Sequence, residues 1–163
     1  MCYHQLEQRD TIENMKTLVI NKRASFDYEL LEKMEAGLML LGTEVKSARA
    51  GNMSLRGAFV TFRGDEAYLT NATIPPWQMK NAPDNYDPER PRKLLLKKSD
   101  LKHLLGSKRA KGLTIVPIRV YTQGPLLKLE IALARGKGRR SKKQILRERD
   151  IKRDVDRIIR GKE

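Results

Sequence analysis

The chain has 163 residues, a length that suits one domain with a hydrophobic core. It carries 34 lysines and arginines against 20 acidic residues, a net charge of +14, which indicates a nucleic-acid partner. An anionic membrane is the rival partner, but no apolar run reaches the roughly 18 residues of a spanning helix, and the polar start does not resemble a secretory signal. We therefore expect a cytoplasmic protein without a membrane partner.

Short apolar or alternating runs closed by turn residues dominate the chain after Asn14 and predict strands. Two pairs of runs flank three-residue connections that contain glycine, at 63–65 and 123–125, and these predict β-hairpins. In the second hairpin Val116, Ile118 and Val120 alternate with the residues between them, so one face should be apolar. The predicted strands are 18–20, 36–41, 58–62, 66–70, 114–122 and 126–134.

Helices are expected to be fewer. Residues 44–50 predict a short helix ended by Gly51, and Ser99 caps a second one, 100–105, which Gly106 ends. Residues 75–91 predict a long irregular connection, a kind of segment that often carries function. The fold class predicted is mainly β: a small closed OB-type β-barrel with two or three short helices and a basic C-terminal tail, disordered or conditionally helical.

Charge divides the chain unevenly. Residues 134–163 hold 13 lysines and arginines against 5 acids, a net +8, whereas residues 1–133 carry a net +6. We therefore predict an N-terminal extension at 1–14, which should be disordered, an RNA-binding barrel at 15–134 and a basic tail at 135–163.

Two cationic segments of the barrel are candidate phosphate contacts, because neutralising backbone charge supplies much of RNA affinity. Asn21, Lys22 and Arg23 follow the first strand, with a solvated loop as the alternative. Lys46 and Arg49 lie three apart and share one face of the predicted helix. For that helix the alternative is one exposed basic face without an RNA role.

A third segment, 90–98, places leucines between two basic clusters. The leucines should pack on the barrel, while Arg92, Lys93 and Lys97 are equally suited to solvent and to RNA. Carboxylates have a place at such a surface, because they accept hydrogen bonds from a ribose 2′-hydroxyl or an exocyclic amine. Trp77, Tyr86 and His103 could stack on bases, although the core would use most aromatic side chains.

Catalysis and metal binding lack the residues they need. Cys2 is the single cysteine, and His4 and His103 lie in no ligand-spaced motif, so we expect no metal and no cofactor. Glu35 and Glu44 would need a cleft and a raised pKa to act as an acid/base pair. The chain is therefore predicted not to be an enzyme.

The tail has a helical pattern in its second half. Ile151, Val155, Ile158 and Ile159 fall at i, i+4, i+7 and i+8. A helix of this length is marginal without packing, so we expect it to fold on an anionic partner. A dispensable solubilising tail is the alternative.

From about Met15 to Ile159 the sequence resembles the SmpB family, which binds transfer-messenger RNA in bacterial trans-translation. The resemblance rests on the order and spacing of five segments: Asn21-Lys22-Arg23-Ala24, Glu35-Ala36-Gly37-Leu38, Gly42 to Gly51, Arg92-Lys93-Leu94-Leu95-Leu96, and Ala134-Arg135-Gly136-Lys137.

The resemblance implies an OB-type barrel that binds the tRNA-like domain of transfer-messenger RNA, and a tail that enters the decoding region and empty mRNA channel of a stalled ribosome. Elongation factor Tu would be an indirect partner. The implied RNA-binding residues are Asn21, Lys22, Arg23, Glu35, Glu44, Lys46, Arg49, Arg92, Lys93, Leu95 and Lys97. The implied ribosome-binding residues of the tail are Arg135, Lys137, Arg139, Arg140, Lys142, Lys143 and Arg147.

The chain departs from the family pattern in places. Gly138 interrupts the basic run, and Ser141-Lys142-Lys143 stands where an Asp-Lys-Arg triplet is usual. Arg140 stands where a ring is common, and Lys97 where asparagine is frequent. These changes affect individual contacts and leave the cationic character in place. Two other classes stay open: a ribosomal protein with a basic extension, and an enzyme acting on RNA.

Overall fold

The structure, a computed structural model, describes residues 15–161, with the backbone alone at 110–111 and 139–141. The predicted extension at 1–14 lies outside the described residues. In chain order the elements are β1 (Met15–Ile20), α2 (Ala24–Asp27), β2 (Tyr28–Leu38), α3 (Gly42–Arg49), β3 (Phe59–Arg63), β4 (Glu66–Thr70), η1 (Met79–Asn81), β5 (Arg92–Leu95), α4 (Lys98–Lys111), β6 (Thr114–Gln123), β7 (Leu126–Gly136) and α5 (Arg139–Arg160).

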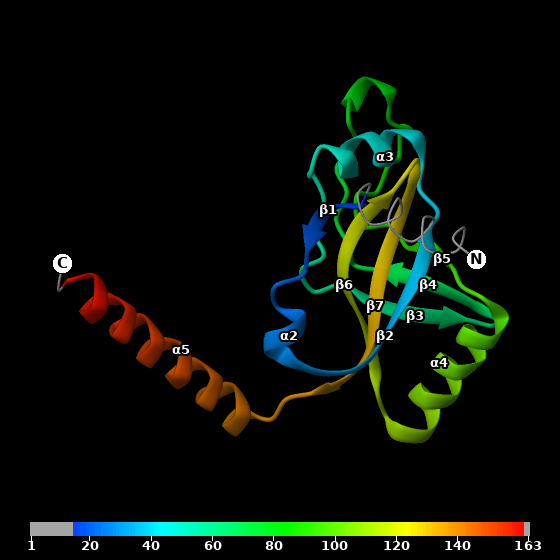
Figure 1. The fold of residues 1–163 in the computed structure, drawn as a ribbon. Helices are drawn as coiled ribbons and strands as arrows, with labels where there is room; N and C mark the ends of the chain where they lie inside the picture. Colours follow the sequence, from blue (N-terminus) through cyan, green and yellow to red (C-terminus); the bar gives the residue numbers. More distant parts are fainter. Residues whose placement is uncertain (1–14, 162–163) are drawn as a thin grey trace, which may run out of the picture.

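Seven strands form one antiparallel sheet in the order β1-β6-β7-β2-β5-β4-β3. The predicted closed barrel is wrong: among the described strands β1 and β3 are the two edges, and no ladder joins them. The sheet curves enough for β3 to lie against β6 (Figure 1). Helices lie around this sheet, so the fold mixes α and β.

Both hairpins expected from glycine-containing loops are confirmed. β3 pairs with β4, and β6 pairs with β7. Gly64 and Gly124 in the two turns have φ of +60° and +58°, a backbone conformation that glycine adopts without the clash of a Cβ.

The predicted alternation along β6 breaks at Pro117. The register between β6 and β7 shifts between Pro117 and Arg119, where proline has no N–H to give to the ladder. Because of this bulge, Ile115 and Val120 both join the main core, although they are five residues apart. An odd-numbered residue, Ile115, therefore faces the main core before the bulge, and an even-numbered one, Val120, faces it after the bulge.

The helix predicted at 100–105 is longer than expected. α4 runs from Lys98 to Lys111, with Gly106 in its interior, and ends at Gly112, whose φ is +59°. Leu104 is fully buried, and Leu101 packs against the same core. This packing offsets the roughly 1 kcal/mol that an interior glycine costs a helix.

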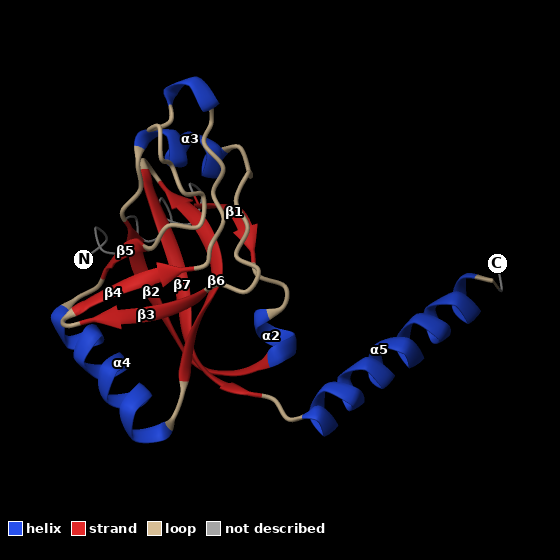
Figure 2. Cartoon of the chain, turned by 180° about the vertical axis from the view of Figure 1, so that it is seen from behind, coloured by secondary structure: helices blue, strands red, loops and turns tan. Residues whose placement is uncertain are grey.

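The main core is apolar and lies inside the curve of the sheet. It draws on β3 to β7 and on the segment before β3, with Leu55, Leu69, Leu129 and Ile131 at 1% exposure or less. The helical pattern expected in the tail is present as α5, which projects away from the sheet (Figure 2). The predicted boundary at 134/135 falls two residues before the end of β7.

Candidate nucleic-acid interface

Glu35 lies on β2, on the outward face of the sheet. The Tyr121 hydroxyl, from β6, donates to Glu35 Oε2, and Lys128 Nζ, from β7, lies 3.0 Å from Glu35 Oε1. The hydrogen bond from Tyr121 and the nearby Lys128 outweigh partial burial and hold the pKa of Glu35 below its usual range. The carboxylate is thus held in its ionised form while its side chain stays 46% exposed.

Leu95 lies on the same face of the sheet as Glu35, because Leu95 of β5 pairs with Gly37 of β2, two residues after Glu35. A Cβ on Gly37 would meet the Leu95 Cβ at 3.1 Å, so glycine allows the leucine to lie across β2. Leu95 is 51% exposed although it is apolar. Lys93, on the same strand, forms an ion pair with Glu66 of β4, and Lys97 is the exposed residue that precedes α4. We call Glu35, Leu95 and Lys128 the sheet-face cluster.

Glu44 and Arg92, two predicted RNA contacts, have no exposed surface. Arg92 Nη2 lies 2.9 Å from Glu44 Oε1, and Arg90 Nη2 lies 2.7 Å from Glu44 Oε2. Burial raises the pKa of Glu44, but hydrogen bonds from Arg90 and the Leu41 N–H, with the charge of Arg92, bring it below its usual value. In this conformation both residues hold the fold together and neither presents an atom to a ligand.

Lys46 and Arg49, predicted to contact phosphate from one face of the helix, have different surroundings. Arg49 Nη2 donates to the carbonyl of Pro125, in the turn between β6 and β7, at 2.8 Å. Lys46 instead lines a hollow of about 300 Å³ between α3 and the connection that carries Trp77. The two cations are exposed, and each remains available to a separate contact.

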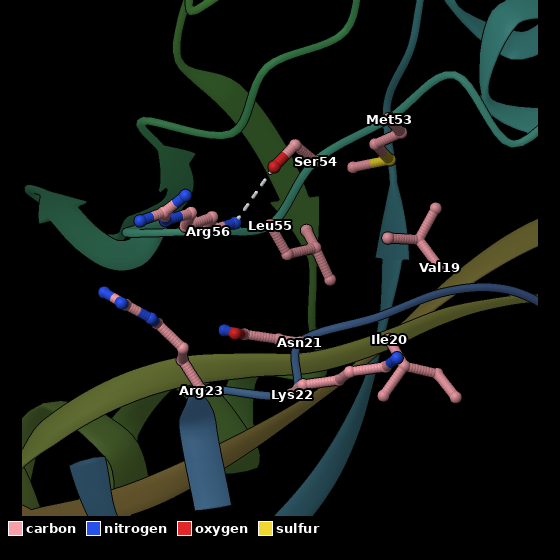
Figure 3. A pocket seen from close by; sticks show the side chains of 9 residues that line it. All are labelled: Val19, Ile20, Asn21, Lys22, Arg23, Met53, Ser54, Leu55 and Arg56. Carbon is pink, nitrogen blue, oxygen red and sulfur yellow. Dashed lines mark hydrogen bonds between the residues drawn. The ribbon is translucent and has the colours of Figure 1, made fainter. Parts of the chain in front are cut away.

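Asn21, Lys22 and Arg23 form the turn between β1 and α2. Asn21 closes the turn, because its side-chain amide donates to the Pro117 carbonyl at 3.0 Å. A hollow of about 370 Å³ opens beside them, and Arg56 lies on its opposite wall (Figure 3). The side chains of Arg23 and Arg56 lie toward the same end of this hollow. Sequence reasoning missed Arg56, because it is a lone cation 33 positions away from Arg23.

The tail begins against α2. The Lys137 N–H donates to the Asp27 carbonyl at 2.9 Å, and Lys142 Nζ lies 2.9 Å from Asp27 Oδ1. The Arg149 guanidinium lies over the Phe26 ring, 5.2 Å from its centroid. These contacts, which we call the α2 dock, were missed in the sequence, because neither Phe26 nor Asp27 belongs to a motif there.

From residue 142 onward, most side chains of α5 outside the α2 dock are exposed. Arg139 and Arg140 form its first turn, and the predicted cations Lys143 and Arg147 follow. Arg135 lies before the helix, at the end of β7. Five large apolar side chains of α5 are between 47% and 63% exposed, while Ile145 is half-buried. The five are Leu146, Ile151, Val155, Ile158 and Ile159. Such an apolar stripe is typical of a helix that meets a partner.

The family model described as SmpB protein matches residues 18–161. The chain is also 45% identical over 148 residues to the SsrA-binding protein of Thermosynechococcus vestitus, covering 91% of this chain and 97% of that protein. The chain belongs to the SmpB family. This confirms the resemblance and, because SmpB proteins are not enzymes, the prediction of a non-enzymatic protein.

Other SmpB relatives agree. The SsrA-binding protein of Exiguobacterium sibiricum is 46% identical over 148 residues, covering 91% of this chain and 94% of its own length. A solved structure, "tmRNA-SmpB: a journey to the center of the bacterial ribosome", contains a chain 46% identical to this one with a TM-score of 0.62. The alignment covers 79% of this chain and 94% of the other.

Metal binding and membrane crossing find no support in the part of the chain that the structure describes. No group of three or more histidine, cysteine, aspartate or glutamate side chains is arranged to hold a metal ion there. Among the same residues, no helix combines the length and the apolar character that crossing a bilayer requires.

Proposed function

We propose that the chain is an RNA-binding adaptor of trans-translation, which binds transfer-messenger RNA at its tRNA-like domain and delivers it to stalled ribosomes. The observation that carries this proposal is the match to the SmpB family over residues 18–161. The names of the relatives, SsrA-binding protein, and the tmRNA–SmpB structure on the bacterial ribosome support both partners.

The sheet body, residues 15–134, is the part that we assign to transfer-messenger RNA. The ionised carboxylate of Glu35 accepts hydrogen bonds from 2′-hydroxyls or exocyclic amines, and the exposed Leu95 packs against a ribose or a base. Exposed cations around this face contact phosphates. The proposed contacts are Lys22, Arg23, Lys46, Arg49, Lys93 and Lys97, with Asn21 shaping the first turn.

The tail, residues 135–163, is the part that we assign to the ribosome. Its cations suit a channel walled by RNA, and its unpartnered apolar stripe gives the helix a second surface to bury on arrival. It occupies the decoding region and the empty mRNA channel, where no codon competes for the space. Elongation factor Tu takes part indirectly, through the aminoacylated RNA, and the protein acts in the cytoplasm.

The experiment that tests the proposal compares two RNAs over a salt series. The purified protein is titrated with the tRNA-like domain of transfer-messenger RNA and, separately, with an ordinary tRNA. We expect a preference for the first that persists at physiological salt. Equal affinities that fall together as salt rises would indicate charge attraction alone. A ribosomal protein would then be the better reading, with equal occupancy of stalled and translating ribosomes.

A further inference from the structure

The connection between β4 and β5 leans over α3, above the sheet (Figures 1 and 2). Between them lies the hollow of about 300 Å³ that Lys46 borders, at the lower end of the size range of ligand pockets. Trp77 is 47% exposed there although it is a large aromatic side chain. The residues around the hollow are Gly42, Thr43 and Lys46 from α3 and Trp77, Gln78 and Asn81 from the connection.

A buried network fixes this connection to α3. Arg92 Nη1 donates to the Ala72 carbonyl at 2.6 Å and Arg92 Nη2 to the Pro88 carbonyl at 2.7 Å, so the same side chain holds both ends. The Tyr86 hydroxyl is within hydrogen-bond distance of the Ile74 carbonyl, at 2.6 Å, and of Glu44 on α3, at 3.0 Å. The hollow is thus held open by structure that forms before any ligand arrives, which lowers the entropy cost of binding.

The groups around the hollow combine three kinds of chemistry. Trp77 offers an aromatic face. Lys46 offers an exposed ammonium that, among the described residues, is in no ion pair. Asn81 Nδ2 donates to Gln78 Oε1 at 2.7 Å, and each amide keeps a further donor and a further acceptor. An unpaired nucleobase with its own phosphate matches all three.

We propose that this hollow is a base-stacking subsite, in which one unpaired base of the bound RNA lies on the Trp77 ring, its edge meets Gln78 and Asn81, and its phosphate meets Lys46. This inference rests on the proposed function and adds a site to it. Stacking on aromatic rings tolerates any base, so the subsite supplies affinity and fixes the position of the strand.

The helix α3 borders both the subsite and a hollow beside the sheet-face cluster. Val45, the neighbour of Lys46 on α3, borders a second hollow of about 350 Å³ together with Gly37, Leu95 and Lys128. An RNA strand that lies on the sheet-face cluster therefore reaches Trp77 by crossing a single helix.

Trp77 is the single tryptophan of the chain, so its fluorescence reports this site without a label. The full-length protein is titrated with dye-labelled tRNA-like domain, and the anisotropy of the dye measures binding while tryptophan emission measures stacking. We expect the emission to be quenched along the same curve as the anisotropy. An anisotropy change with constant emission overturns the subsite and leaves the proposed function standing. No anisotropy change overturns both.

Variants separate stacking from simple proximity. We expect Trp77→Leu to weaken RNA binding roughly tenfold, because the π face is lost, and Trp77→Phe to retain most of the affinity. Lys46→Ala should lower the salt slope of binding by about one. Met79→Ala is the matched control, since Met79 is 81% exposed on the same connection and does not border the hollow. Equal affinity of the Leu and Phe variants overturns the stacking geometry.

Discussion

Glu44 acts at the scale of single residues by joining α3 to the connection that follows β4. Its two carboxylate oxygens meet Arg90 and Arg92, and neither Glu44 nor Arg92 has exposed surface. Burying two charges costs desolvation free energy, which their mutual attraction offsets. If one of the two charges is removed, the other stays buried without this compensation. The ion pairs of Glu44 hold the connection that carries Trp77 against α3, and the hollow that Trp77 borders lies between these two segments.

Replacing Glu44 by glutamine should lower the free energy of unfolding by about 3–5 kcal/mol, because Arg92 would stay buried without its counter-ion. Urea denaturation measures this. Glu66→Gln is the control, since it breaks the exposed pair with Lys93 and should change stability little. Similar losses in the two variants would contradict a special role for the buried pair.

Tyr121→Phe should raise the pKa of Glu35 toward its usual value, because the variant lacks the hydroxyl that donates to the carboxylate. In the wild type the pKa of Glu35 is lower in the folded protein than in the unfolded chain, so Glu35 stabilises the fold at pH values above its unfolded-state pKa. This stabilisation is lost as the pH falls through the pKa of Glu35 in the folded protein. The variant should therefore be less stable at pH 7 by about 1 kcal/mol.

The difference should shrink as the pH is lowered below about 4, which urea denaturation across pH checks. Tyr68→Phe is the matched control, because its hydroxyl donates to Glu66, away from Glu35. If Tyr121→Phe binds the tRNA-like domain as well as the wild type does, the orientation of Glu35 is not important for RNA binding.

At the scale of elements, the short helix α2 determines where the tail begins. It supplies the Asp27 carboxylate to Lys142 and the Phe26 ring to Arg149, while Lys137 bonds to its backbone. The ion pair is partly exposed, so it contributes modestly and weakens with salt. The direction of α5 is thus held by a few contacts between its start and Arg149, near its middle.

Combining Phe26→Ala with Asp27→Asn should release the first turns of α5. We expect faster amide hydrogen exchange over residues 142–150 and an unchanged exchange rate in β6 and β7, because the sheet does not depend on the tail. Asp150→Asn is the control, since among the described residues its carboxylate pairs with Arg153, on α5 itself. Unaltered exchange in the double variant would show that the α2 dock does not hold the tail.

Local signals predicted some elements well and others poorly. The hairpins were predictable because turn glycines mark them, and α5 because its apolar residues repeat at helical spacing. Most of β2, residues 28–35, was missed because most of its side chains are exposed and half of them are charged. The end of α4 was predicted too early, because Gly106 reads as a helix stop. The helix continues past it because Leu104 packs into the core, and such tertiary packing has no local signal. Whether the sheet closes into a barrel depends on whether its edge strands, β1 and β3, pair with each other. No local sequence pattern predicts that pairing.

The prediction of the site was less accurate where a side chain's partner is distant in the sequence. Glu44 and Arg92 read as exposed RNA contacts because each is a charged residue in a basic segment, yet they are partners 48 positions apart. Phe26, Asp27 and Arg56 gain their surroundings only in the folded chain. The cations of the tail could be located from composition, because they lie close together along the chain, and their contact with the ribosome stays a prediction.

At the scale of the whole molecule, the body and the tail have separate surfaces. The sheet-face cluster lies on β2, β5 and β7, whereas α5 contacts the body through the α2 dock. Removing the tail should therefore leave the RNA-binding surface folded.

Deleting residues 138–163 keeps β7 and Lys137 intact, and we expect binding to the tRNA-like domain to remain within about threefold of the wild type. Some loss follows from the removed positive charge. Trans-translation on stalled ribosomes, which by the resemblance to the SmpB family adds a peptide tag to the unfinished protein, should be abolished. A binding assay and a tagging assay on the same preparation measure the two effects. Equal losses of binding and tagging would contradict the separation of the two surfaces.

The α2 dock also has a mechanical consequence. α5 contains 22 residues and is about 33 Å long, and the α2 dock holds it from its start to Arg149, near its middle. The 11 residues after Arg149 extend about 17 Å beyond the dock, so turning α5 by about 10° at Arg149 displaces its end by about 3 Å. A small rotation of α5 at the α2 dock therefore moves Ile158 and Ile159 further than it moves Lys142, and the dock that limits this rotation is built on a helix of four residues.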